Sequence, residues 1–285
     1  MQFLFSDMNK KFNNPVMTTP SQSEFDRLSK QIFYSLDELK ELEDSADLYG
    51  KIDAIGDVVV FLKGFRYMAG AKDDYTVNVA VVCNYLEMLK PGVSDSIVMS
   101  EYPIHAIYNE LQPMGLSVGF DEFEKTMIES GPTNIALSLM ESNQVDLNSV
   151  SKELNQSLKV LIENAVTACK NGDIAGAMFL SDKAIALCYI ITTIANVNLD
   201  IVLTSIYESN MTKFCKDESE LSASIQAYTD AGIKVVEDTG TDFPFKVIRS
   251  AEEQTVNGKL YSAGKFLKSV TFKEPTFTVE SVKCS

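Results

Sequence analysis

The sequence has little histidine, no tryptophan and no paired cysteines. His105, in YPIHAIY, is the single histidine of the 285 residues, which argues against Ser-His-Asp triads and histidine-built metal sites and favours a surface or helix-capping position for it. The five cysteines are odd in number and lack CxxC spacing. Neither a disulfide framework nor a zinc ribbon is therefore indicated, and a reducing cytoplasm is expected.

Positive charge and long apolar runs are also scarce. The chain has 25 Lys and Arg against 40 Asp and Glu, a net charge of −15, so its average surface would repel nucleic acid and anionic membranes. The longest apolar candidate, 184–197, is broken by two threonines and an asparagine. We expect no membrane span and no secretion signal. With 45% apolar and 23% charged residues the composition is that of an ordinary globular protein, and a small ligand suits it best.

Helical periodicity dominates the sequence. Over 23–46, apolar residues recur every three or four positions, which predicts a long amphipathic helix; these residues are Leu28, Ile32, Leu36 and Leu39. Further helices are predicted at 51–70, 75–89, 150–170, 174–196 and 200–214, with shorter helices between 93 and 148. Near the C-terminus, FPFKVIRS and GKFLKSVTF are rich in aromatic and β-branched residues and predict a β-hairpin. The expected fold class is all-α, a helical bundle with a small C-terminal β appendage.

A faint internal repeat lies at an offset of 126 residues. The shift lays 57–87 over 183–213 and keeps three residues, Ala69 on Ala195, Asp74 on Asp200 and Asn84 on Asn210. Three identities are near chance, but a helix, a break and a second helix coincide in phase, which suggests a divergent tandem duplication. The predicted division is 1–92, a degenerate second half at 93–215, and the α/β appendage at 216–285.

The acidic residues of two neighbouring predicted helices form the pattern that points most clearly to a functional site. Glu38 and Glu41 are three positions apart on one predicted helix, and Asp53 and Asp57 are four apart on the next, so each pair shares a helix face. Such like charges repel unless a divalent cation lies between them, and oxygen ligands favour Mg²⁺, with Mn²⁺ as the second choice. The competing interpretation is a solvated acidic face. Against it, Asp53 and Asp57 interrupt an otherwise apolar segment, IDAIGDVVVFL.

These residues resemble a known family. The segment DELKE followed by DAIGDVVVFLKGF is similar to the EExxE and ExxD pattern of the all-α nucleoside triphosphate pyrophosphohydrolases of the MazG and phosphoribosyl-ATP pyrophosphohydrolase superfamily, especially bacteriophage-type members. Ala54 departs from the pattern, since the family has Glu there, and Asp53 is its substitute. Downstream, SNMTK and GKFLKSVTFKEP resemble the end of these proteins. The resemblance covers roughly 1–90 and 180–280.

The resemblance implies a Mg²⁺-dependent enzyme that cleaves a (d)NTP, such as dUTP or dCTP, to (d)NMP and pyrophosphate in the cytoplasm, that of the host if the protein is viral. Glu38, Glu41 and Asp57 would be catalytic and, with Asp53, would hold the metal. One of these carboxylates, or Asp37, would orient the attacking water. The implied substrate-binding residues are Asn210, Lys213 and, from the first half, Asn84.

Two alternatives stay open. Asn210 and Lys213 are also residue types favoured at a helix C-terminus, and Ala54 supports a catalytically inactive all-α nucleotide-binding or protein-interaction module. At the 126-residue offset the four acids become Asn164, Thr167, Phe179 and Lys183, so a second copy would hold no metal there. The duplication would make a monomer sufficient, while association into a homodimer remains the other expectation.

Overall fold

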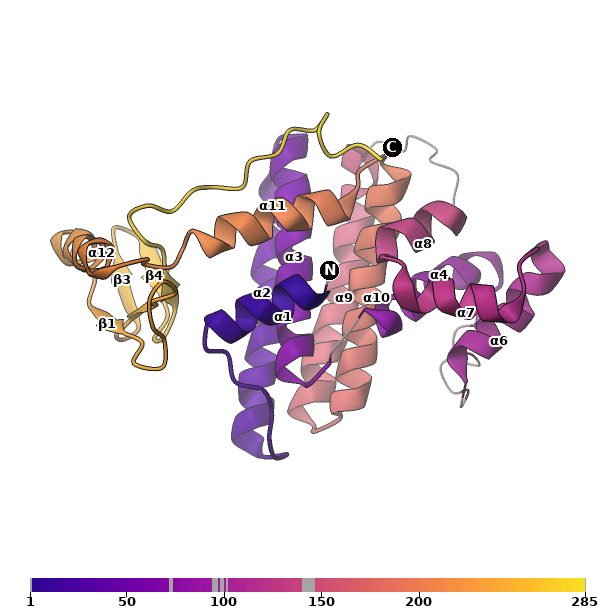
Figure 1. Ribbon diagram of the computed structural model, residues 1–285, viewed down its shortest axis with the longest axis horizontal. Helices are drawn as coiled ribbons and strands as arrows, with labels where there is room; N and C mark the ends of the chain where they lie inside the picture. The colour runs from indigo at the N-terminus through magenta and orange to yellow at the C-terminus, as the bar shows by residue number, and fades with distance from the viewer. Residues whose placement is uncertain are drawn as a thin grey trace. The chain divides into compact units, whose positions relative to one another are not determined.

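The computed structural model describes residues 2–71, 74–93, 97, 100, 102–139 and 147–284, and these fall into two units (Figure 1). The helical unit consists of the described residues of 1–3, 16–203 and 277–285, and the mixed unit of 4–15 and 204–276. The division lies within helices α1 (Gln2–Lys11) and α11 (Leu199–Met211). The two units are defined by how the chain packs. The predicted division at 92 and 215 rests on the suggested tandem duplication instead, so it stays a prediction.

Four long helices form the core of the helical unit. They are α2 (Gln22–Asp44), α3 (Leu48–Met68), α9 (Leu147–Lys170) and α10 (Ile174–Ile194). Helix α2 packs on α3 and α9, and α10 packs on α9 and α3 (Figure 1). The stripe predicted on α2 is buried at Leu28, Ile32 and Leu39. The amphipathic pattern thus identified the face that enters the core.

Shorter helices complete the helical unit. Helix α4 (Tyr75–Leu89) has the predicted bounds and packs on α10. The segment after it forms α6 (Pro103–Leu111), the 3₁₀ turn η1 (Gln112–Met114), α7 (Phe120–Glu129) and α8 (Pro132–Leu139). Helices α7 and α8 contact α4, as does α6. The expectation of several short helices in this region is therefore confirmed.

Helices α3 and α10 begin in the same way. Each is 21 residues long and is preceded by an aspartate cap. The carboxylate of Asp47 accepts the amide N–H of Gly50 at 2.7 Å, and the carboxylate of Asp173 accepts that of Gly176 at 2.8 Å. Both bonds satisfy a donor that the first helical turn leaves open. The two caps and the two glycines are each 126 positions apart.

The two helices also end alike. Gly70 and Asn196 follow them with φ of 96° and 61°, the left-handed conformation that closes many helices. Asparagine is one of the few residues besides glycine that adopts it readily. The closing bonds run from Ala71 N to Arg66 O at 2.8 Å and from Val197 N to Thr192 O at 2.7 Å. The 126-residue offset therefore relates both ends of α3 to both ends of α10.

Within the described part of the chain, α10 alone is long and apolar enough to cross a membrane. In the helical unit it packs against α3, α4, α8 and α9, and its buried residues include the polar Ser181, Asp182, Thr192 and Thr193. Helix α10 is therefore the central helix of the bundle in the helical unit.

The mixed unit contains two small antiparallel sheets and one further helix. Strands β1 (Val235–Glu237), β2 (Ile248–Ser250) and β5 (Phe266–Leu267) pair in the order β1-β2-β5. Ile248 lies opposite Leu267, so the two aromatic-rich segments pair as predicted, but they do not form the predicted hairpin, because two further strands lie between them in sequence and β1 adds a third strand to their sheet. Strands β3 (Gln254–Val256) and β4 (Lys259–Tyr261) form a hairpin through Asn257 and Gly258, both at positive φ, as a two-residue type I′ turn requires.

Helix α12 (Glu218–Asp230) packs beside β1. Its Leu221 joins Cys215, Ile233, Ile248 and Leu267 in a small apolar core. This core is modest, so polar ties between loops contribute to the stability of the mixed unit.

Arg249 of β2 provides the principal polar tie of the mixed unit. Its Nε donates to Asp238 at 2.7 Å, and its Nη2 donates to the carbonyl of Phe12 at 2.8 Å. Burial acts to raise the pKa of the Asp238 carboxyl, but hydrogen bonds from Arg249 and from the Gly240 amide outweigh it and hold that pKa below its usual value. The ionised carboxylate is thus the form that the fold stabilises.

Candidate functional site

The four predicted metal ligands lie on the antiparallel pair α2 and α3. Glu38 is half-buried and Glu41 is exposed on α2, and Asp53 and Asp57 are half-buried on α3. The two helices are joined by a three-residue turn at 45–47 and pack along their length. The fold thus brings both acidic pairs to one helix pair, as the spacing predicted.

Asp53 and Asp57 stand out because of their surroundings. Their neighbours Ile52, Ala54 and Val58 are buried, so α3 presents its carboxylates from a helix that is mostly buried. A carboxylate in such a position needs a polar or cationic partner to compensate for lost water. This placement favours a functional or ion-pairing role over a simple solvated face for these two residues.

Carboxylate oxygens are the donors that Mg²⁺ prefers, so the chemistry of the set fits this ion. Across 2–71, 74–93, 97, 100, 102–139 and 147–284, however, no three His, Cys, Asp or Glu side chains converge as a group that could hold a metal ion. The helix pair therefore supplies the right donors without the arrangement of a completed site.

A network of buried charges lies elsewhere on α3, and it was not predicted from the sequence. Lys63 is fully buried and Arg66 is 1% exposed. Lys63 pairs with Asp74, which precedes α4, and Arg66 pairs with Asp182 of α10. Arg66 Nη1 also donates to Thr76 Oγ1 at 2.9 Å. These contacts tie α3 to α4 and α10 through the middle of the helical unit.

One pair of this network, Lys63 with Asp74, has an equivalent at the 126-residue offset. Tyr189 of α10 occupies the position equivalent to Lys63, and Asp200 of α11 the position equivalent to Asp74. The Tyr189 hydroxyl donates to Asp200 Oδ1 at 2.9 Å, and Tyr189 is fully buried. Each pair thus joins a central helix to the N-terminal end of the next one, with a cation as donor in one case and a phenol in the other.

Burial governs the protonation of these groups. It lowers the pKa of the Lys63 ammonium, an effect that the Asp74 carboxylate opposes. Burial acts to raise the pKa of the Asp74 carboxyl, but the charge and the hydrogen bond of Lys63, together with the charge of Arg66, keep that pKa below its usual value. Burial, followed by the charge of Asp200, raises the pKa of the Tyr189 phenol well above its usual value. Tyr189 is therefore a neutral hydrogen-bond donor at neutral pH.

The sequence did contain a signal for this network. Lys63 and Arg66 interrupt the same apolar segment as Asp53 and Asp57, and the argument from the cost of burying a charge applies equally to them. Their contacts, to Asp74 from the next helix and to Asp182 more than a hundred residues away, give them a structural role as ties between helices.

The predicted substrate-binding residues are divided between the units. In the helical unit, Asn84 Nδ2 donates to the carbonyl of Lys183 on α10 at 3.1 Å. In the mixed unit, Asn210 is 5% exposed and its carbonyl accepts the amide of Lys213 at 3.1 Å. Lys213 Nζ lies 5.7 Å from the centre of the Phe272 ring. The helix-end geometry expected as the alternative is present at 210–213, and binding of a substrate there stays a prediction.

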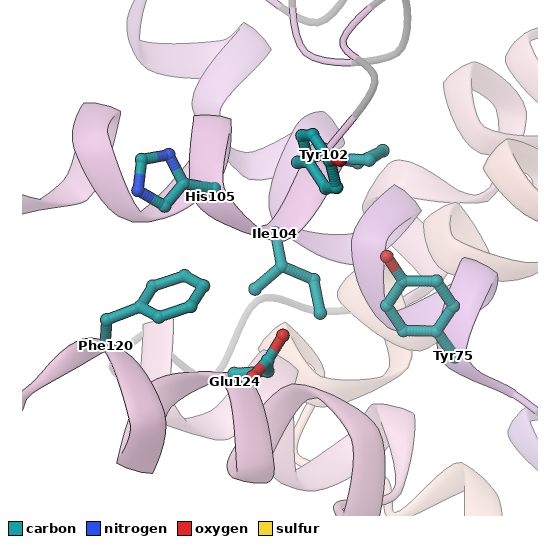
Figure 2. A pocket seen from close by; sticks show the side chains of 7 residues that line it. Tyr75, Tyr102, Ile104, His105, Phe120 and Glu124 are labelled. Carbon is teal, nitrogen blue, oxygen red and sulfur yellow. The ribbon is translucent and has the colours of Figure 1, made fainter.

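A surface pocket of about 410 Å³ lies on α4, α6 and α7 (Figure 2). It is lined by Tyr75, Tyr102, Pro103, Ile104, His105, Phe120 and Glu124. His105 is exposed on α6, which agrees with the expected surface position. The pocket brings aromatic rings and one carboxylate from three helices together, an arrangement that sequence spacing did not reveal.

Charge is distributed unequally between the units. The mixed unit contains 11 Lys and Arg against 12 Asp and Glu, so 14 of the 15 net negative charges belong to the helical unit. The helical unit also contains the acidic pairs and the pocket. Its potential therefore attracts cations to both.

No protein-family model, curated protein or solved structure matches this chain.

Proposed function

We propose that this chain is a Mg²⁺-dependent nucleoside triphosphate pyrophosphohydrolase of the MazG-like, bacteriophage type, acting in the cytoplasm on a deoxynucleotide such as dUTP or dCTP. The observation that supports it most is the position of Asp53 and Asp57 on a mostly buried helix that packs against the helix bearing Glu38 and Glu41. Paired carboxylates on adjacent antiparallel helices suit a divalent cation and a phosphate substrate.

In this proposal, Glu38, Glu41, Asp53 and Asp57 hold the cation. Mg²⁺ would supply charge neutralisation for the phosphate oxygens when bound. A carboxylate of the group, or the exposed neighbour Asp37, accepts a proton from the water that attacks the α-phosphorus. The bond to the bridging oxygen between the α- and β-phosphates breaks, and pyrophosphate leaves. The proposal requires the four side chains to converge when the cation binds.

We further propose that the helical unit contains two divergent copies of one unit. The matched ends of α3 and α10 support this, as do the equivalent pairs Lys63 with Asp74 and Tyr189 with Asp200. The first copy keeps the acids, whereas the second has Lys183 at the position equivalent to Asp57. One chain would then hold one acidic site.

The competing function is a nucleotide-binding or protein-interaction module without turnover. Two observations favour it: the family's glutamate position is occupied by the buried Ala54, and no three of the described carboxylates form a group that could hold a metal ion. The two functions differ in whether the nucleotide is consumed.

The test is pyrophosphate release from a panel of dNTPs with Mg²⁺, with the nucleoside monophosphate identified as the second product. Asp57→Asn is expected to lower the rate at least tenfold, since it removes a charged ligand at the proposed cation site. A nucleotide that binds without being consumed would favour the inactive module. If Asp57→Asn retained full activity, the proposed site would be wrong although the reaction class was right.

A further inference from the structure

The described lining of the pocket on α4, α6 and α7 supplies one carboxylate and several aromatic faces. Tyr75, Tyr102 and Phe120 contribute rings, and Glu124 contributes a carboxylate (Figure 2). None of the lining residues that the structure describes is Lys or Arg. In Figure 2 the Glu124 carboxylate points up between Phe120 and Tyr75, with Ile104 above it. The pocket therefore combines apolar contact, π faces and a negative charge.

The carboxylate of Glu124 differs in its partners from other acids of this region. Other acids of this region have cationic partners, as Glu110 does in Lys90 at 3.1 Å and Glu129 in Lys125 at 3.9 Å. Among the residues that the structure describes, Glu124 has no ion-pair partner, and its side chain is half-buried. A half-buried carboxylate without a counter-charge favours a cationic ligand.

The aromatic wall is held in place before any ligand arrives. The Phe120 ring makes edge-to-face contacts with the His105 ring, with 5.1 Å between the ring centres, and with the Tyr108 ring, with 5.4 Å between the ring centres. The Tyr108 hydroxyl donates to the carbonyl of Val118 at 3.2 Å, which fixes the loop before α7. Because Phe120 is already oriented, a ligand that stacks on it loses less entropy than it would against a mobile ring.

The size and charge of the pocket narrow the ligand class. A volume of about 410 Å³ lies within the usual range for small-molecule sites. A phosphorylated ligand would be repelled by Glu124 and by the acidic helical unit. A hydrated inorganic cation would not benefit from the aromatic rings. An organic cation with methyl groups on its nitrogen has the low hydration and the charge that such rings recognise.

We propose that this pocket binds a compact quaternary or highly methylated ammonium compound, with Glu124 opposite its charge and the rings of Phe120, Tyr75 and Tyr102 around its methyl groups. This site does not depend on the proposed pyrophosphohydrolase activity, because its described residues lie on α4, on α6 and the residue before it, and on α7, rather than on α2 and α3.

The test compares choline with 3,3-dimethyl-1-butanol, which has the same shape and no charge, in ligand-observed NMR titrations of the full chain. Choline is expected to bind saturably and at least tenfold more tightly than the alcohol. Glu124→Gln is expected to weaken choline binding at least fivefold, and Phe120→Leu, which keeps the apolar bulk without the π face, at least threefold.

Glu122→Gln is the matched control, since Glu122 is exposed on the same helix and does not line the pocket; choline affinity should be unchanged, and circular dichroism of each variant verifies its fold. Equal binding of the neutral alcohol would overturn the proposal in favour of a merely apolar pocket. Saturable binding of a nucleoside without choline binding, no saturable choline binding, or undiminished affinity in Glu124→Gln would likewise overturn it.

Discussion

Removing one partner of the buried Arg66 and Asp182 pair should cost a large part of the stability of the helical unit. Their side chains are 1% and 5% exposed. Asp182→Ala therefore leaves a buried guanidinium that keeps its hydrogen bond to the Thr76 hydroxyl but loses its carboxylate partner on α10. Breaking such a pair typically costs about 3–5 kcal/mol. Domains are stable by only about 5–15 kcal/mol in total, so the loss should be plain.

Urea unfolding followed by circular dichroism at the helical band measures this loss. With a slope of roughly 2–3 kcal/mol per M, the midpoint should fall by about 1–2.5 M. Arg66→Met combined with Asp182→Ala removes both charges, so the double variant should be more stable than Asp182→Ala alone. If the double variant is more stable than Asp182→Ala, the loss in the single variant comes from an uncompensated buried charge rather than from lost packing.

The exposed pair Lys283 and Glu280, 48% and 79% exposed, provides the matched control. Glu280→Ala should cost no more than about 1 kcal/mol, because solvent screens such pairs. A loss below about 1 kcal/mol for Asp182→Ala, or a double variant no more stable than the single one, would refute the reasoning.

Three further results are expected. Asp238→Asn should destabilise the mixed unit by about 1.5–3 kcal/mol at pH 6. This loss should shrink as the pH falls below the pKa of an unfolded Asp, about 4, and then through the lowered pKa of Asp238 in the folded protein. A loss of stability that did not change with pH would contradict the ion pair of Asp238 with Arg249. Burial raises the pKa of the Cys83 thiol to about 11 and that of Cys188 to about 12, so a thiol reagent at pH 8 should modify the half-buried Cys284 first and the buried thiols only on unfolding. Gly172 has φ +82, and an added Cβ would lie 3.2 Å from a ring carbon of Phe25, whereas Gly70 has φ +96 and open space around it. Gly172→Ala should therefore lower the melting temperature more than Gly70→Ala. Equal decreases in melting temperature would show that the Phe25 ring moves aside without cost.

The helices could be predicted well because their apolar periodicity is strong. The bounds of α4 were predicted to the residue, and α2 begins and ends within two residues of its predicted range. Helix α12 was missed although Asp217, whose carboxylate accepts the amide of Glu220 at 2.9 Å, begins a capping pattern visible in the sequence. Helix α1 was missed because its ten residues contain only a short apolar patch.

The candidate site was predictable only in part. Helical spacing was enough to assign Glu38 and Glu41 to one helix and Asp53 and Asp57 to the next. The ion pairs of Lys63 and Arg66 depend on which helices pack together, and the pocket combines residues of three helices; packing of this kind is not encoded in local periodicity.

The most direct measurement of the central claim is the rate of Mg²⁺-dependent pyrophosphate release by the wild-type chain, Glu41→Gln and Glu43→Gln. Both glutamates are exposed on α2, so the two substitutions match in charge and setting, and only Glu41 belongs to the proposed cation site. The account predicts that Glu41→Gln loses at least tenfold in rate while Glu43→Gln keeps the wild-type rate. No pyrophosphate release from any nucleotide, or equal rates in the two variants, would contradict it.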